Sequence, residues 1–181
     1  MLAGYTLGVG TQALAEPPSA PVAVQAQIMT RILPFERGFA NRARDGVTVL
    51  IVERANDADS SNAAHQMKRA LGDIGSVASR PITSVSVSFT SAANLAAECR
   101  ERNAQVVYLS PGLAGEVPAI AAALTNSGVL TVAAVEPNVP RGAVLGIEVV
   151  AGKPHMSVNL AQAKAQKLDF PSAVLKLARI Y

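Results

Sequence analysis

Hydrophobic periodicity along the chain alternates between strand-like and helix-like. Residues 47–52, 105–109 and 129–135 are nearly continuous apolar runs, typical of strands that are covered on both faces. The segments between them carry apolar residues every three or four positions, which predicts amphipathic helices over about 60–74, 90–102 and from 117 until Gly128. Strands that alternate with such helices predict a mainly parallel sheet with helices on both faces.

Residues 82–89 have a different pattern, in which Val85 and Val87 alternate with serines. An alternating strand buries only one face, so we expect it at an edge of the sheet. A further amphipathic helix is predicted from residue 22 to Pro34, where a proline ends or kinks it.

The last forty residues predict a hairpin followed by two helices. Residues 143–150 and 155–160 are strand-like and are joined by turn-forming residues, which indicates an antiparallel hairpin. Asn159 is placed to cap a short helix, and its side chain would accept from the first turn. Pro171 then suits the start of a second helix, because its fixed φ fits that position.

In that second helix, Val174 and Leu177 fall on one stripe with Ala178 and Tyr181. We therefore expect the helix to continue to the end of the chain and to pack against the sheet. On this interpretation the substitution Leu177→Asp would be severely destabilising, because it places an unpaired charge in the core.

Composition is consistent with one compact domain. The 181 residues are 50% hydrophobic and 16% charged, which suits a single buried core and argues against disorder. The predicted fold class is therefore α/β: a three-layer sandwich with a mainly parallel sheet, helices on both faces and a C-terminal antiparallel hairpin, over residues 22–181.

The N-terminal residues 1–15 carry no charge and end in Ala-Leu-Ala, a pattern typical of a signal peptide cleaved after Ala15. The missing basic start suggests that this signal is truncated, and a disordered cytoplasmic leader is the alternative. Residues 16–21 read as a proline-rich spacer. No stretch approaches the length of a membrane span, and nucleic-acid binding is disfavoured because no basic cluster is interleaved with aromatic residues.

Polar residues follow several predicted strands, at the edge of the sheet where α/β proteins usually bind ligands. The residues expected at this rim are Glu53, Asn56, Asp57, Asp59, Thr90, Ser110, Glu136 and Asn138. Five of them form the candidate strand-end site: Asn56, Asp57, Asp59, Ser110 and Asn138. The two aspartates are more typical of Asx turns than of an acid/base pair, and Ser110 lacks the surrounding glycines of a hydrolase nucleophile.

Other chemistry is equally sparse in the sequence. His65 and His155 lie far apart and give no metal-ligand spacing. Cys99 is the only cysteine, and we expect it to be buried as a small apolar residue, with a reactive or dimer-bridging thiol as the alternative. We predict no catalytic, cofactor or metal site, and no enzymatic activity.

The segment M-S-V-N-L-A-Q-A-K-A-Q-K-L-D-F-P-S-A-V-L-K-L-A resembles the closing segment of the YfiR-like (YfiR/HmsC-like) family, with Asn159, Leu160, Leu175 and Leu177 at the family-like positions. Residues 128–132 and 47–52 are similar to two of the family's core strands. The resemblance spans about residues 25–181.

The resemblance implies a periplasmic regulatory or accessory protein without a cofactor. The founding member of this family is a periplasmic regulator that binds and represses an inner-membrane diguanylate cyclase. We therefore expect a homodimeric, exported regulator that binds the periplasmic region of an inner-membrane signalling protein and tunes cyclic-di-GMP-dependent biofilm or exopolysaccharide output. The alternative is a small-ligand-binding component of an envelope transport or sensing system, and an enzyme of unrecognised type is the third and least favoured class.

Overall fold

The computed structural model describes residues 16–181, so the predicted signal peptide lies outside the described residues. The centre of the fold is a sheet of eight strands in the order β2-β3-β1-β4-β5-β6-β7-β8. The strands are β1 (Val47–Glu53), β2 (Ser76–Val77), β3 (Arg80–Ser88), β4 (Val106–Leu109), β5 (Leu130–Ala133), β6 (Leu145–Val150), β7 (Lys153–Val158) and β8 (Ala178–Ile180).

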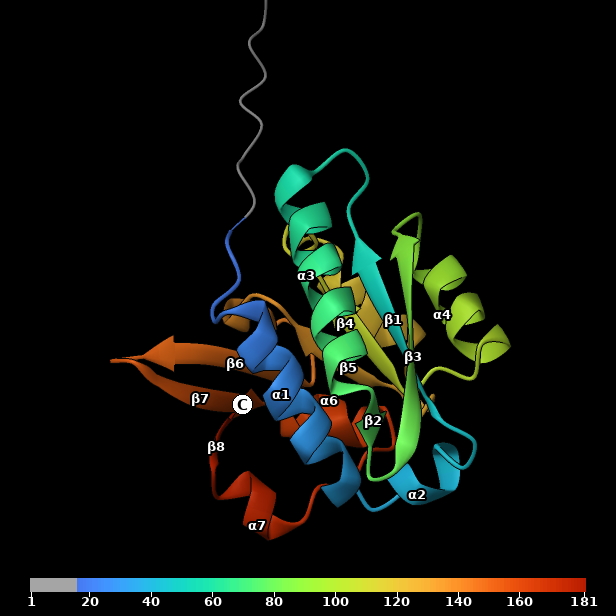
Figure 1. Cartoon of the computed structure of the whole chain (residues 1–181), viewed down its shortest axis with the longest axis vertical. Helices are drawn as coiled ribbons and strands as arrows, with labels where there is room; N and C mark the ends of the chain where they lie inside the picture. The colour runs from blue at the N-terminus through green and yellow to red at the C-terminus, as the bar shows by residue number, and fades with distance from the viewer. Residues whose placement is uncertain (1–15) are drawn as a thin grey trace, which may run out of the picture.

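Five neighbouring strands of this sheet, from β3 through β1, β4 and β5 to β6, are parallel. The hairpin of β6 and β7 is antiparallel, with Leu145 opposite Val158. Helices cover both faces, and Figure 1 shows α3 and α4 on opposite sides of β1 and β3. The predicted fold class is thereby confirmed.

The longer helices are α1 (Val22–Ile32), α3 (Ala58–Ile74), α4 (Ala92–Glu101), α5 (Val117–Ala123) and α6 (Leu160–Ala165). Short turns of helix complete the chain: η1 (Leu33–Phe35), α2 (Phe39–Arg42), η2 (Glu136–Asn138) and α7 (Ser172–Leu175).

Side chains of alternating residues divide the core into two clusters, one on each face of the sheet. Val49 and Ile51 of β1 pack with α1 and α3, whereas Leu50 and Val52 pack with α4 and α5. All four side chains are buried. Burial on both faces explains why the sequence of this strand is continuously apolar.

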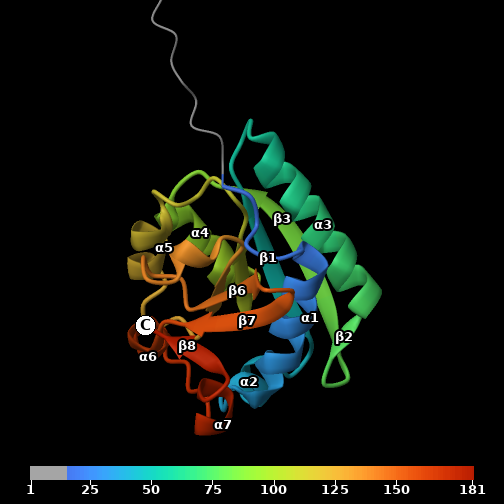
Figure 2. The ribbon, with the colours of Figure 1, turned by 90° about the vertical axis from the view of Figure 1, so that its left-hand side faces the viewer.

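The serine-rich strand β3 lies near one edge of the sheet, as its alternation predicts. Only the two-residue strand β2 is beyond it, and β2 pairs with Arg80 and Pro81 alone. Figure 2 shows this edge beside α3, on the far side of the sheet from the hairpin of β6 and β7.

The end of the chain differs from the sequence prediction. The second helix ends at Leu175, and residues 178–180 form β8, which pairs in parallel with β7. The Tyr181 N–H donates to the Val158 carbonyl at 2.9 Å, and the Leu160 N–H donates to the Tyr181 carbonyl at 3.1 Å. Leu177 falls between helix and strand and is 79% exposed, so its predicted place in the core was wrong.

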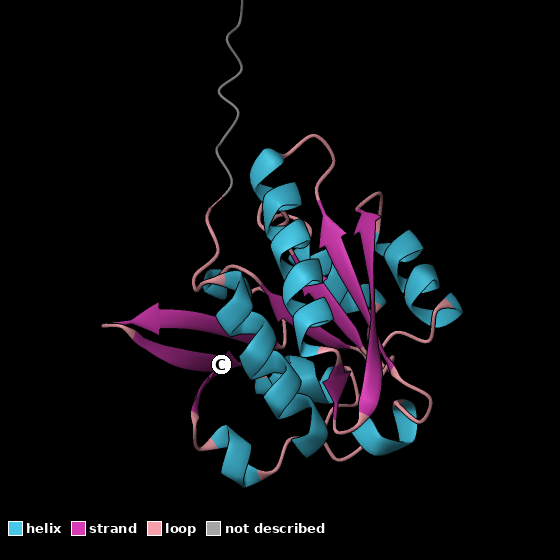
Figure 3. Ribbon diagram, in the orientation of Figure 1, coloured by secondary structure: helices cyan, strands magenta, loops and turns pink. Residues whose placement is uncertain are grey.

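The physical reason is that a helix could not pair the open edge of β7. A strand gives β7 a ladder of backbone hydrogen bonds, which favours extending the sheet over continuing a short helix. Figure 3 shows that the hairpin of β6 and β7, to which β8 is added, projects sideways from the rest of the sheet.

Candidate functional site

The predicted rim lies where β1, β4 and β5 end, and the structure brings only part of it together. Asp57 caps α3, because its Oδ1 accepts from the Ser60 N–H at 2.9 Å. From the sequence, Ser60 or Ser61 is expected to cap this helix, and that prediction was wrong. Ser60 is instead buried, and its hydroxyl accepts from the Arg54 N–H at 2.9 Å.

Gly112, in the loop after β4, lies directly against Asp57. A Cβ atom on this glycine would stand 2.6 Å from Asp57 Oδ2, and the backbone φ of +85° is unfavourable for other residues. The segments after β1 and β4 are therefore in contact, because the Gly112 backbone lies against the Asp57 carboxylate. No ligand fits between these atoms.

Arg54 covers the same part of the rim. Its Nε donates to the Gly112 carbonyl, and its guanidinium forms a 3.3 Å ion pair with Glu116 at the start of α5. The chain's own arginine thus occupies the position that a ligand's polar groups would take at the end of β1 and β4.

The remaining predicted rim residues are apart from this contact. Asn56 is an exposed turn residue with a φ of +59°. Asp59 is exposed in the first turn of α3, where its negative charge interacts favourably with the helix dipole. Asn138 is buried in η2 beyond β5, and its carbonyl accepts from the Ala143 N–H at 3.1 Å. These three residues serve local structure.

Ser110 is 1% exposed, and its hydroxyl has no hydrogen-bond partner among the described residues. Pro111 follows it and removes a backbone donor that an oxyanion would need. Over residues 16–181, no three His, Cys, Asp or Glu side chains converge in a metal-binding arrangement.

Glu136 is the most heavily used carboxylate at this end of the sheet. It is 5% exposed and accepts hydrogen bonds from the hydroxyls of Ser157 and Tyr181, while Arg179 lies 3.6 Å away. The Glu136 N–H also donates to the Ser19 hydroxyl. The sequence placed Glu136 after a strand but gave no sign that it ties β7 and β8 to η2.

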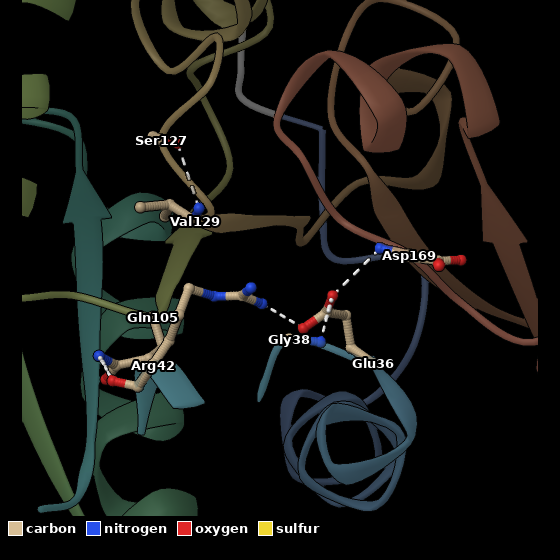
Figure 4. Close-up of polar contacts among 7 residues, drawn as sticks. All are labelled: Glu36, Gly38, Arg42, Gln105, Ser127, Val129 and Asp169. Atoms are coloured by element: carbon tan, nitrogen blue, oxygen red, sulfur yellow. Dashed lines mark hydrogen bonds and ion pairs between the residues drawn. The ribbon is translucent and has the colours of Figure 1, made fainter. Parts of the chain in front are cut away.

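A second buried carboxylate, Glu36, lies at the opposite end of the sheet (Figure 4). It accepts from the Gly38 and Asp169 N–H groups, each at 3.1 Å, and pairs with the Arg42 guanidinium. Sequence reasoning missed this cluster, because its partners are up to 133 residues apart. Its role is to join α2 to the segment after α6.

Cys99 is 4% exposed on α4, so the prediction of a buried cysteine is confirmed. Burial raises the pKa of its thiol to about 11, since desolvation disfavours the thiolate. At neutral pH the group stays protonated and is a poor nucleophile.

A cavity of about 440 Å³ lies at the carboxyl end of β3, between that strand and α4. Its apolar lining includes Val52, Val87 and Leu95, and its only two charged lining residues are Glu98 and Glu101. None of the five candidate residues lines this cavity, but Thr90, which the sequence also places at the rim, does. The alternation of residues 82–89 predicted the edge position of β3 but gave no sign of a cavity beside it.

Solved structures with a similar fold are α/β proteins of the periplasmic-binding type. The ABC domain from Streptococcus pneumoniae in complex with L-Trp gives a TM-score of 0.64 at 11% identity, covering 89% of this chain and 62% of the other. A conserved domain protein from Vibrio cholerae gives 0.64 at 17% identity, covering 89% and 60%. The substrate-binding protein CD0873 from Clostridium difficile gives 0.60 at 14% identity, covering 80% and 57%.

The chain thus spans about three fifths of the length of these structures, and the similarity concerns the fold alone. No curated protein matches the chain by sequence. The model of the YfiR/HmsC-like family matches residues 22–179, so the chain belongs to the YfiR/HmsC-like family. Membership supports a regulatory role in the periplasm in general. Within residues 16–181, no helix is both long and apolar enough to span a bilayer.

Proposed function

We propose that this protein is an exported, homodimeric regulator that binds the periplasmic region of an inner-membrane signalling protein. The target that the family resemblance implies is a diguanylate cyclase, which the regulator represses, so that it lowers cyclic-di-GMP-dependent biofilm or exopolysaccharide output. The observation that carries this proposal is the family match over residues 22–179.

The rim geometry supports binding of a protein rather than turnover of a substrate. Arg54, Asp57 and Gly112 fill the space at the ends of β1 and β4 with the chain's own groups. The carboxylates of Glu36 and Glu136 are likewise engaged in contacts within the fold. At the ends of β1 and β4, an accessible surface rather than a deep reaction pocket is then the feature available for function.

A small-ligand-binding role is the second candidate, and the fold of the solved structures favours it. One of those structures holds L-Trp and another is a substrate-binding protein. This chain corresponds to only part of their length, and a ligand at the ends of β1 and β4 would have to displace the Arg54 contacts.

Affinity capture from solubilised native envelope, followed by mass spectrometry, tests the proposal. The expected result is recovery of a membrane protein that combines a periplasmic segment with a cytoplasmic diguanylate cyclase domain. Recovery of no membrane signalling protein with a folded, exported bait would contradict the proposal. A small molecule retained in native mass spectrometry of the same bait would favour the second candidate.

A further inference from the structure

Strand β3 has a free outer edge over most of its length. The pairing with β2 stops at Pro81, and within residues 16–181 no other strand lies beyond it. On the inner side, β3 pairs with β1 throughout residues 82–88. A sheet edge of this kind presents a row of unpaired backbone groups.

The hydrogen-bond pattern identifies which residues face outward. Phe89 donates its N–H inward to the Glu53 carbonyl at 2.7 Å, whereas Ile82 donates outward to the Gly75 carbonyl at 3.0 Å. Because alternate residues of a strand point their N–H groups to the same side, Ser84, Ser86 and Ser88 point theirs outward with Ile82. Three consecutive outward positions are therefore available to another strand.

The edge also lacks the usual protection against pairing. Residues 81–90 contain no charged side chain, and β-branched valine, isoleucine and threonine supply half of these positions. Native proteins usually block long edges with lysine, internal proline or bulges. Pro81 is the only proline of β3, and it lies at the end that β2 already covers.

The cavity between β3 and α4 includes Ser88 of this edge in its lining. Val87 and Leu95 supply apolar lining, Ser88 and Asn94 supply polar groups, and both charged lining residues, Glu98 and Glu101, are acidic. Glu98 is paired with Arg102 one turn along α4, whereas Glu101 has no ion pair among the described residues. The cavity therefore favours a side chain with an apolar stem and a positive end, such as lysine or arginine.

We propose that the edge of β3 and this cavity together form a docking groove for an extended, basic peptide segment of a protein partner. The segment adds to the sheet as a strand through Ser84, Ser86 and Ser88, and a basic side chain enters the cavity beside Glu101. Backbone pairing supplies affinity and the cavity supplies specificity, as in other cases of strand addition.

A second copy of the chain is a less suitable occupant. Pairing β3 with β3 of another copy would bring no basic side chain to the cavity, because residues 81–90 contain none. The proposal rests on the proposed function, because the partner segment would belong to the periplasmic region of the regulated membrane protein.

The test is a titration of the purified full chain with a capped seven-residue peptide that alternates valine and lysine. Calorimetry measures the affinity, and NMR chemical-shift changes locate the binding site. Ser86→Pro removes one outward donor while leaving the ladder to β1 intact, and proline is tolerated at such edge positions. Ser86→Ala, the matched control, keeps the donor. We expect binding to the wild type and to Ser86→Ala, at least a tenfold loss with Ser86→Pro, and a several-fold loss with Glu101→Lys.

A wild-type readout makes the test independent of whether Ser86→Pro folds. Methylation of alternate backbone nitrogens of the peptide blocks strand pairing, so one of the two methylation registers should abolish binding. Equal binding of both methylated peptides, or of a valine and glutamate peptide, would overturn the proposal. So would a wild-type dimer that Ser86→Pro dissociates and that binds no peptide, since the edge would then serve a second copy.

These results are separate from the capture experiment. Peptide binding that follows the expected pattern, with no membrane protein captured, would retain the groove and reject the proposed function. Capture of a diguanylate cyclase with equal yield by a folded Ser86→Pro bait would retain the function and reject the groove as its docking surface.

Discussion

Val174 and Leu177 are three residues apart and have opposite environments. Val174 is 7% exposed and belongs to the core cluster with α1 and α3, whereas Leu177 is 79% exposed between α7 and β8. Helical periodicity assigned both residues to one buried stripe, because it assumed that the helix continues. The backbone instead turns into an extended strand after Leu175, which separates the two side chains.

A pair of substitutions tests this difference. Leu177→Asp should change the free energy of unfolding by no more than about 0.5 kcal/mol, because the new charge remains in water. Val174→Asp should cost about 3 kcal/mol or more, since it buries an unpaired carboxylate. Urea denaturation measures both, and equal large losses would mean that residues 172–181 pack as the helix that the sequence indicated.

The role of a residue was easier to predict when it depends on neighbouring residues than when it depends on contacts between distant segments. Asn159 caps α6 by accepting from the Gln162 N–H at 2.9 Å, as its position in the sequence indicated. The pairing of Glu36 with Arg42 and the Asp169 backbone depends on segments that only the folded chain brings together. Sequence spacing contains no information about such contacts, so the cluster could not be predicted.

At the scale of elements, the Glu36 cluster connects α2 to the segment between α6 and α7. A carboxylate that is 3% exposed accepts two backbone N–H groups and one guanidinium there, so its removal leaves several donors without a partner. The nearby pair of Arg37 and Asp169 joins the same elements, but its side chains are 68% and 59% exposed.

We predict that Glu36→Ala lowers the free energy of unfolding by about 2–3 kcal/mol, because a buried ion pair loses one member. The matched control, Arg37→Ala, should cost well under about 1 kcal/mol, since solvent screens an exposed pair. Thermal or chemical denaturation at neutral pH compares the two. Similar small effects would show that the cluster does not hold α2 in place.

Elements with a continuous apolar pattern were predictable, and elements defined by pairing were not. The strands β1, β4 and β5 follow directly from their apolar runs, and β3 was placed near an edge because one of its faces is polar. The short strands β2 and β8 have too few residues for periodicity to register. They form because an adjacent edge offers hydrogen bonds, which is a property of the assembled sheet.

At the scale of the whole molecule, the cavity lies at a different part of the sheet from the site that the sequence predicts. The predicted rim at β1 and β4 is closed by Arg54 and Asp57, while the accessible cavity lies at β3 beside α4. The polar residues and the cavity lie at the same end of the sheet, and the contacts of Arg54 and Asp57 close the part at β1 and β4. The free edge of β3 and the cavity beside α4, rather than the strand ends of β1 and β4, are therefore the features on which the proposed docking groove rests.

The most direct test of the central claim is the cyclic-di-GMP content of cells that lack this protein, compared with cells in which the wild-type chain is restored. The account predicts a several-fold rise without the protein and a return to the original content with it, because the proposed function is repression of a membrane diguanylate cyclase. An unchanged content in both strains, with the restored chain present in the periplasm, would contradict it.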